Sequence, residues 1–444
     1  MNPWAKIRHL SRLFSEYAIA QAFIQLLGVI AGLWLVNLLP LSEYALYTLA
    51  LSIFTFLSVF SDLGISSALL YFRRETRIAQ AAFAPYVRAA LMLRHGLLII
   101  GAGAALAFIF AVGPDRGFRT YDLSLTVAVL IAAVWVQIGA STALLQLRLE
   151  GIYRESYLAE MLGNALRLLG VGLMWLVSAP LAWLAMLTGA AGSLMTGFIA
   201  ARHLPKFRHD ALSNAARSDP GPARAIARYV LPMSLSAVYF SIQGPLTVWL
   251  SAYFAGTNTI AEVGALGRLG IIFSMVSGFM GAVLIPRLSV VTDDGHYLRR
   301  YLQFWVILAA FGVGVVGAVH LFPHWLLLLL GEAYRGLESG VVLVAISSVL
   351  STWGGYVVSI NSARGWVRHQ HLIILLYAAI QVAFVATLDL STTNGVLLYG
   401  IWSGVAGLLL QFSVNVAGFL SPELLTVRDR TTLADASQWM KADR

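Results

Sequence analysis

The chain has 444 residues, of which 59% are hydrophobic and only 11% are charged. Soluble proteins carry roughly 25% charged residues, so composition rules out a water-soluble enzyme of this length. The formal net charge is +9, from 30 Lys and Arg against 21 Asp and Glu, and cysteine is absent. The sequence therefore has no disulfide framework, no thiolate metal site and no cysteine nucleophile.

The first residues predict an amphipathic segment at the membrane surface. In residues 1–16, Trp4, Ile7 and Leu10 recur at helical spacing, with basic residues between them. The apolar run at 17–39 is too long for a signal-peptide core, and no small-residue cleavage site follows it. We therefore expect a cytoplasmic or interfacial segment, a turn, and then a retained first span.

Apolar segments of spanning length follow one another along the whole chain. A transmembrane helix takes about 20 apolar residues. The expected spans lie at about 17–39, 43–70, 88–112, 123–146, 156–178, 181–201, 229–254, 262–286, 301–322, 339–360, 371–389 and 395–419. The sequence thus predicts an all-α polytopic membrane protein with about 12 transmembrane helices.

The basic residues alternate between the expected loops. With the N-terminus inside, 24 of the 30 Lys and Arg fall on inside segments, 3 fall on outside loops and 3 fall within spans. Cytoplasmic loops of membrane proteins carry an excess of Lys and Arg. This distribution predicts that both termini are cytoplasmic and that the loops containing Arg116 and Arg335 lie outside.

The longest inside loop divides the chain after the sixth span. We expect an N-terminal six-helix lobe at 17–201, a cytoplasmic linker at 202–228, a C-terminal six-helix lobe at 229–420 and a cytoplasmic tail at 421–444. Both lobes begin inside, so a weak similarity between them indicates a parallel pseudo-repeat, as in some transporters. The alternative is that any two six-helix membrane segments look alike.

Motifs for catalysis and metal binding are missing from the sequence. It contains no G-x-x-x-x-G-K-[ST] phosphate-binding loop and no H-E-x-x-H or clustered metal motif. The expected outside loops are too short to form a catalytic domain. The sequence therefore predicts no catalytic residue, no metal and no cofactor.

Polar residues follow one face of the fifth span. Glu160, Asn164 and Arg167 are spaced at i, i+4 and i+7. A charge within a membrane costs about 2.5–3.5 kcal/mol on insertion scales, so it usually faces a cavity or a partner. One interpretation is a substrate-binding cavity, in which the Arg167 guanidinium suits phosphate or carboxylate. The other is a Glu160–Arg167 network, bridged by Asn164, that joins helices.

Three further charged residues lie within or near spans. Arg268, in the eighth span, is a candidate anion contact in a cavity, or it snorkels to the outer interface. Arg94 is predicted to snorkel to the inner interface. Asp62 is expected to pair with Arg73, Arg74 or a cavity arginine. Asp62 and Arg94 are also candidates for coupling or gating.

The seventh span contains helix-breaking residues. Pro232 and Pro245 each free a carbonyl and bend a helix, and Gly244 adds flexibility. These three residues are gating candidates, although static proline kinks are common in membrane proteins. Gln243 beside them is a candidate cavity residue.

Several short stretches occur in an order typical of one family. Residues 61–69 follow the pattern D-x-G-x-x-x-A late in the second span. Residues 146–153 join the fourth and fifth spans, 265–289 contain Arg268 and end in P-x-x-S, and 330–334 precede the tenth span. In this order, they resemble the polysaccharide flippases, of O-antigen and exopolysaccharide type, in the multidrug/oligosaccharidyl-lipid/polysaccharide (MOP) exporter superfamily.

The resemblance implies a MATE-like two-lobed bundle that is a transporter and not an enzyme. Its cavity would open alternately to each side of a bacterial inner membrane. It would flip an undecaprenyl-diphosphate-linked oligosaccharide for polysaccharide or lipopolysaccharide biosynthesis, alongside a polymerase and glycosyltransferases, and it would not bind nucleic acid. Arg268 matches a cationic eighth-helix position. One alternative is a cation-coupled drug exporter of the same fold, and another is an intramembrane glycosyltransferase, ligase or polymerase partner.

Overall fold

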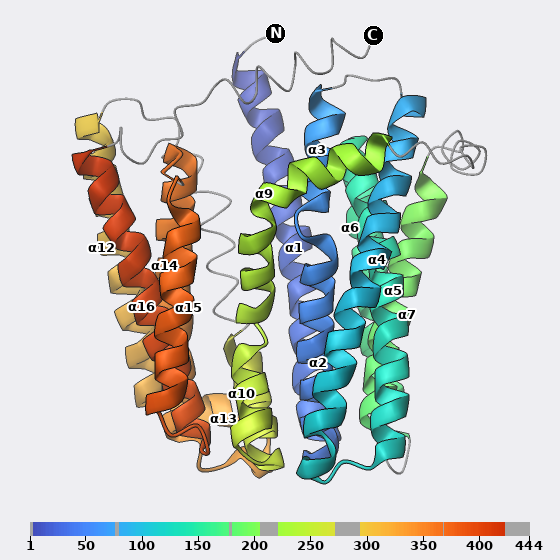
Figure 1. The fold of residues 1–444 in the computed structure, drawn as a ribbon, viewed down its shortest axis with the longest axis vertical. Coiled ribbons are helices and arrows are strands. Elements are labelled where there is room, and N and C mark those ends of the chain that lie inside the picture. Colours follow the sequence, from blue (N-terminus) through green and yellow to red (C-terminus); the bar gives the residue numbers. More distant parts are fainter. Residues whose placement is uncertain are drawn as a thin grey trace. The chain divides into compact units, whose positions relative to one another are not determined.

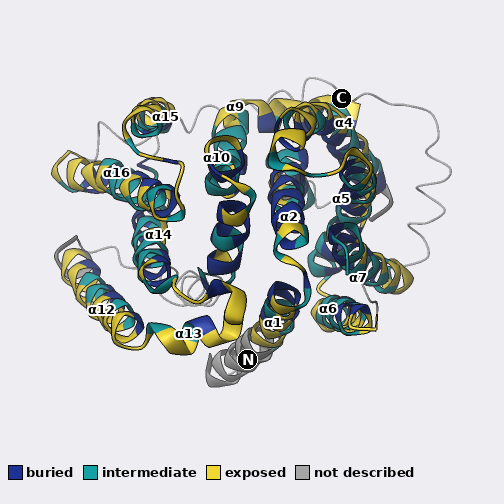
Figure 2. Ribbon diagram, turned by 90° about the horizontal axis from the view of Figure 1, so that it is seen from below, coloured by how far each residue is buried: buried dark blue, intermediate teal, exposed yellow. Residues whose placement is uncertain are grey.

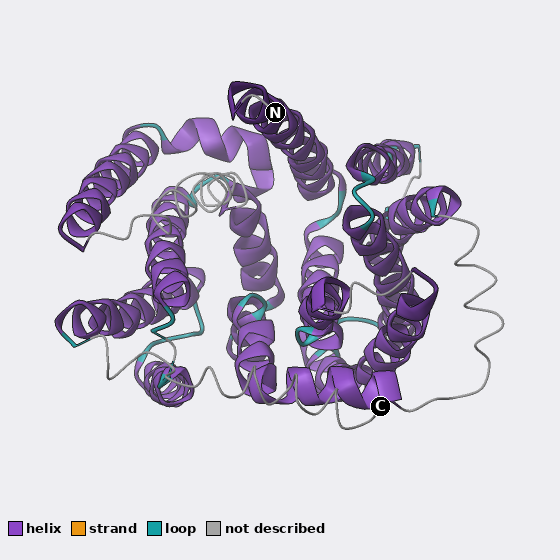
Figure 3. Ribbon diagram, turned by 90° about the horizontal axis from the view of Figure 1, so that it is seen from above, coloured by secondary structure: helices purple, strands orange, loops and turns teal. Residues whose placement is uncertain are grey.

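The computed structural model describes residues 3–75, 80–176, 180–204, 221–270, 294–366 and 368–421. Within these ranges nearly every residue is helical and no strand occurs (Figure 3), which confirms the expected all-α fold. Three sequence-based assignments fall mainly outside the described residues. They are the linker at 202–228, the second half of the span at 262–286 and the tail at 421–444.

Ten of the described helices are long and apolar enough to cross a membrane, and they correspond to ten of the twelve expected spans. Two expected spans are not among these ten. The span at 156–178 corresponds to α6 (Tyr153–Met174), whose hydropathy is lowered by its polar stripe. The span at 262–286 begins in a helix at 257–270 and continues beyond the described residues. The chain is a multi-pass membrane protein.

Large apolar side chains point away from the packed interior. Leu169 and Leu173 of α6 are 64% and 63% exposed, and Ile99 and Ile100 of α4 (Gln80–Val112) are each 67% exposed. Figure 2 shows the same pattern of exposed outer faces on other helices. Such surfaces are stable in hydrocarbon and costly in water, as expected of helices that face lipid.

The chain forms two compact units. The first contains Met1–Ile271, His324–Glu338 and Leu390–Val396, and the second contains Ile272–Pro323, Ser339–Asp389 and Leu397–Arg444. In the first unit, the further helices are α1 (Pro3–Leu38), α2 (Leu41–Asp62), α3 (Ile65–Glu75), α5 (Thr120–Leu149), α7 (Ala182–His203), α9 (Gly221–Gln243) and α10 (Leu246–Phe254), with α13 (Pro323–Leu330) and the short turns η1 (Pro114–Arg116) and η2 (Glu332–Tyr334). The second is built mainly from α12 (Asp294–Leu321), α14 (Glu338–Arg364), α15 (Gln370–Thr387) and α16 (Thr393–Leu420).

Helix α1 differs from the expectation for the N-terminus. It runs for 36 residues without interruption, so the turn predicted between 1–16 and 17–39 is not present. After Pro3 this helix contains no proline, and nothing else in the sequence breaks the backbone hydrogen-bond ladder. The expected turn was therefore wrong, and the cytoplasmic or interfacial location of 1–16 stays a prediction.

The expected span at 43–70 is two helices. Leu63, with φ 39°, and Gly64, with φ 92°, both adopt left-handed backbone and separate α2 from α3. Glycine reaches this region without a Cβ penalty, but leucine there is uncommon. Asp62 caps the start of α3, because its Oδ1 accepts from the backbone N–H of Ser66 at 3.3 Å.

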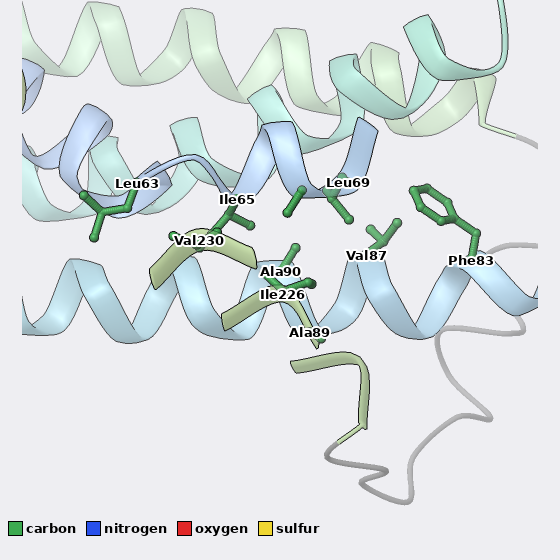
Figure 4. Packing of buried hydrophobic residues seen from close by; sticks show 10 residues of the cluster. Leu63, Ile65, Leu69, Phe83, Val87, Ala89, Ala90, Ile226 and Val230 are labelled. Atoms are coloured by element: carbon green, nitrogen blue, oxygen red, sulfur yellow. The ribbon is translucent and has the colours of Figure 1, made fainter. Parts of the chain in front are cut away.

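Helix α9 packs against α2, α3 and α4. Figure 4 shows Ile226 and Val230 of α9 lying against Ala90 of α4 and Ile65 of α3, in a buried apolar cluster. This packing places α9 in the first unit, although the sequence assigned most of it to the second lobe. The division into six-helix lobes on either side of 202–228 stays a prediction.

Helices α6 and α7 approach each other at glycines. A Cβ on Gly163 would lie 2.6 Å from the carbonyl oxygen of Gly192 and would also collide with the Thr196 hydroxyl. Small residues allow membrane helices to pack backbone against backbone. This close approach fixes the helix that carries Glu160, Asn164 and Arg167.

A set of contacts joins helices at the end of the first unit where α1 finishes, and we call it the collar. Asn37 Nδ2 donates to the Leu329 carbonyl at 3.0 Å. Arg116 Nε donates to the Ala252 carbonyl at 2.7 Å, and the Thr257 hydroxyl donates to the Arg116 carbonyl at 2.8 Å. The collar thus ties α1 and η1 to α10, α13 and the helix at 257–270.

The second unit has a buried polar network among its own helices. Tyr301 donates its hydroxyl hydrogen to Asn415 Oδ1 at 2.7 Å, Asn415 donates to Asn361, and Asn361 donates to Gln411 Oε1 at 3.0 Å. Tyr301, Asn361 and Asn415 are all buried. Because these groups are paired with one another, they join α12, α14 and α16 rather than mark a binding site.

Candidate functional site

A cavity of about 300 Å³ lies among α1, α2, α5, α6 and α7. Much of its lining is apolar or small, and each of the five helices contributes at least one polar side chain. The polar lining residues are Gln21, Tyr47, Gln137, Glu160, Asn164, Arg167, Ser193 and Thr196. The three residues of the predicted stripe on α6 therefore share one cavity, as the spacing indicated.

The ion pair within the stripe is not the one that the sequence suggested. Glu160 Oε1 accepts from Arg148 Nη2 of α5 at 2.8 Å, and Arg148 Nε also donates to the Ser156 hydroxyl at 3.0 Å. Asn164 Nδ2 donates to the backbone carbonyl of Glu160 at 2.9 Å. The predicted Glu160–Arg167 network with Asn164 as its bridge was wrong, because α5 brings a closer cation to Glu160.

Arg167 is held by a tyrosine. Its Nη2 donates to the Tyr47 hydroxyl of α2 at 3.3 Å. Its Nε is buried without a hydrogen-bond partner among the described residues. The remaining N–H groups of this fork are available to a ligand that offers acceptors.

Arg268 contacts the same tyrosine. Its guanidinium carbon is 5.6 Å from the centre of the Tyr47 ring, a cation–π contact, and its Nε is 3.4 Å from the Tyr44 hydroxyl. Gly32 of α1 leaves room for it, since a Cβ there would be 3.4 Å from Arg268 Cδ. Arg268 is not among the residues that line the cavity.

Neither arginine has an acidic partner in the described part of the chain. The ion pairs found there join other residues. Tyr44 and Tyr47 are 0% and 1% exposed, and neither was predicted as a site residue. A signal was available, because two tyrosines at i, i+3 in an apolar span need polar partners for their hydroxyls.

A second cavity, also of about 300 Å³, includes Asp62 and Arg94 in its lining. Arg94 is only 6% exposed, and its Nε lies 3.6 Å from Asp62 Oδ1. Its Nη1 donates to the Thr142 hydroxyl at 2.8 Å. The prediction that Arg94 snorkels to the interface was therefore wrong, because an acidic partner and a hydroxyl hold it inside.

Asp62 has the third of its expected partners, a cavity arginine, since it faces Arg94 and both residues line the second cavity. Arg73 pairs instead with Glu150, at 3.6 Å. Asp62 accepts from the Ser66 hydroxyl at 2.5 Å as well as facing Arg94. Its position at the α2–α3 break places a charged pair beside an interrupted helix.

The helix-breaking residues of the seventh span lie at two places, one within α9 and one between α9 and α10. The chain leaves helical geometry between α9, which ends at Gln243, and α10, which begins at Leu246, so the interruption expected at Gly244 and Pro245 is present. Pro232 lies within α9, and Figure 1 shows that α9 bends along its length. Gln243 lines neither cavity described above.

Comparison with known proteins identifies the fold. No protein-family model matches the chain, and no curated protein does. A solved structure of an inward-facing multidrug resistance MATE family transporter of the MOP superfamily is similar, with a TM-score of 0.63 and 18% identity over 92% of this chain and 98% of that one. The chain therefore has a MATE-like transporter fold.

Other solved structures of similar fold are also transporters of this kind or are described as MATE proteins. One is a MOP superfamily transporter from Pyrococcus furiosus, described as having a binding pocket of reverse polarity that suggests a different function, with a TM-score of 0.58 and 18% identity over 91% of this chain and 94% of that one. Another is a MATE protein in complex with MaD3S, with a TM-score of 0.54 and 18% identity over 91% and 92% of the two chains. At this level of identity, the similarity concerns the fold.

Proposed function

We propose that this protein flips an undecaprenyl-diphosphate-linked oligosaccharide from the cytoplasmic to the outer leaflet of a bacterial inner membrane, by alternating access. The fold similarity supports a transporter. The nature of the cargo rests on one observation. Arg268 lies within a membrane-spanning helix, held by Tyr44 and Tyr47, and no described acidic residue neutralises it.

An uncompensated cation at this depth favours an anionic cargo. A buried charge is costly unless it is paired, so the arginine is expected to gain a partner during the transport cycle. A diphosphate provides several acceptor oxygens that match the guanidinium fork. The sugar chain and its lipid would then lie to either side of the phosphate group, and a polymerase and glycosyltransferases would act on the same cargo.

A cation-coupled drug exporter is the alternative, since the structural neighbours include multidrug transporters. Such a protein needs a carboxylate that is free to bind a cation. In the described residues Glu160 pairs with Arg148 and Asp62 faces Arg94. Both acidic candidates already have a positive partner, and this favours an anionic cargo.

The test is translocation by purified protein in proteoliposomes. The substrate is a fluorescent undecaprenyl-diphosphate sugar, and efflux of a cationic dye is measured in parallel. Arg268→Ala should reduce flipping at least tenfold, and Arg268→Lys should retain part of it, because lysine keeps the charge but loses the fork. Arg335→Ala is the matched control, since Arg335 lies on an exposed turn. Dye efflux without flipping would reject the proposal.

A further inference from the structure

The cavity among α1, α2, α5, α6 and α7 has the size of a site for one small ring. Its volume of about 300 Å³ is at the low end of the roughly 300–1,000 Å³ found for ligand pockets. A lipid-linked chain does not fit into it, but a single cyclic group does. Gly189 contributes to this space, since no atom lies within 4 Å of the Cβ that a larger residue would add.

The cavity lining carries charges of both signs. Glu160 and Arg167 both line it, and Glu160 also pairs with Arg148. A diphosphate placed there would meet the Glu160 carboxylate as well as the Arg167 guanidinium, whereas a sugar ring can donate a hydroxyl hydrogen to the carboxylate and accept from the guanidinium. The lining therefore suits an occupant that bears both donors and acceptors.

The remaining polar groups both donate and accept hydrogen bonds. Gln21, Asn164 and Gln137 project amides from three different helices. Ser193 donates to Gln137 Oε1 at 2.7 Å, which leaves the Gln137 amide N–H groups as donors. A sugar hydroxyl also donates and accepts, whereas a phosphate oxygen accepts only. Convergent groups of both kinds match a polyhydroxylated ring.

We infer that this cavity is a subsite for one sugar ring of the cargo, and that Arg268, which contacts the same Tyr47 as Arg167, contacts the phosphate. The inference rests on the proposed function for the identity of the cargo. Tyr47 links the two places, because its hydroxyl binds Arg167 of the cavity and its ring faces Arg268. Sugar specificity and phosphate recognition would therefore belong to different residues.

The experiment measures equilibrium binding to purified full-length protein. The probes are neutral hexoses, N-acetylhexosamines and disaccharides without lipid or phosphate, and inorganic diphosphate in separate samples. Gly189→Leu fills the cavity with a side chain, and Gln137→Leu removes an amide. Gly139→Leu on α5 is the matched control, since its Cβ also meets open space but the residue is exposed and outside the lining.

Sugar affinity is expected to fall at least tenfold in Gly189→Leu and Gln137→Leu and to stay unchanged in Gly139→Leu. Diphosphate affinity should follow the opposite pattern and fall only in Arg268→Ala. Thermal unfolding identifies any variant that does not fold, and Gly189→Val then replaces Gly189→Leu. The inference is overturned if the unsubstituted protein binds none of the sugars, if the cavity variants bind them normally, or if the cavity takes an organic cation instead.

The outcomes separate this inference from the proposed function. Sugar binding that depends on Gly189, in a protein that does not flip the lipid-linked sugar, would reject the flippase and retain the sugar site. Flipping that persists in Gly189→Leu, with no loss of sugar affinity, would retain the flippase and reject the site.

Discussion

Arg148 and Glu160 lie twelve residues apart, on consecutive helices, and their side chains meet at 2.8 Å beside the cavity. Arg148→Leu should destabilise the protein by about 1–2 kcal/mol, less than the roughly 3–5 kcal/mol of fully buried pairs, because its side chain is 39% exposed. Adding Glu160→Gln should restore stability, measured by thermal unfolding. If Glu160→Gln instead rescues Arg167→Leu, Glu160 pairs with Arg167 after all.

Tyr47 offers two separable interactions. Tyr47→Phe removes the acceptor for Arg167 but keeps the ring beneath Arg268. A hydrogen bond to a charged group is worth about 1.5–3 kcal/mol, so we expect a loss of about 1.5 kcal/mol for a bond of 3.3 Å. Tyr47→Leu should cost more, because it also removes the cation–π contact. Tyr121→Phe, at a residue 75% exposed, serves as the control. Equal stability of the two Tyr47 variants would argue against the cation–π contact.

A single substitution that breaks the buried pair of Asp62 and Arg94 should strongly destabilise the protein. Arg94→Leu leaves Asp62 without its cation, and we expect a loss of about 3 kcal/mol in unfolding free energy. Asp62→Asn in the same protein should recover part of it, since the amide oxygen still accepts from Ser66. Chemical denaturation in detergent measures both. No loss in Arg94→Leu would mean that this arginine reaches the membrane surface.

The close contact between α6 and α7 predicts that adding a methyl group at Gly163 destabilises the protein. Gly163→Ala places a Cβ 2.6 Å from the Gly192 carbonyl oxygen, and overpacking of this kind costs about 1–3 kcal/mol. Gly139→Ala on α5 should instead stabilise slightly, because its Cβ meets open space and alanine favours the helix. The two substitutions should therefore shift the melting temperature in opposite directions, which thermal unfolding of both variants tests.

The topology can be tested without background labelling, since the chain contains no cysteine. Asp115→Cys, between α4 and α5, should react with an impermeant maleimide added outside intact cells. Ser213→Cys, in the expected cytoplasmic linker, should react only after permeabilisation. Outside labelling of Ser213→Cys would refute the orientation.

Much of the fold was predictable because a membrane imposes length and apolarity on each helix. The interruption at Gly244 and Pro245 was also predictable, since proline lacks the N–H that a helix needs. The α2–α3 break was not, because Leu63 adopts a left-handed backbone that its residue type disfavours. Tertiary packing around α3 decides that geometry.

The site was predicted only in part, for a physical reason. Spacing on one helix placed Glu160, Asn164 and Arg167 on a common face, and they share a cavity. Spacing does not show which other helix approaches, so the partners Arg148 and Tyr47 were missed. Arg94 was misplaced for the same reason, since Asp62 reaches it from α2.

The collar has a consequence for the energy balance of a transport cycle. If α1 and η1 separate from α10 and α13 during a transport cycle, the hydrogen bonds of the collar break, and each is worth about 0.5–1.5 kcal/mol net. Together the three are worth about 1.5–4.5 kcal/mol, which is below the roughly 5.5 kcal/mol that shifts a two-state equilibrium from 1:99 to 99:1. All three acceptors are backbone carbonyls, those of Leu329, Ala252 and Arg116, which no substitution removes. The strength of the collar is therefore set on the donor side, by Asn37, Arg116 and Thr257, and evolution can adjust it there without altering the cargo site.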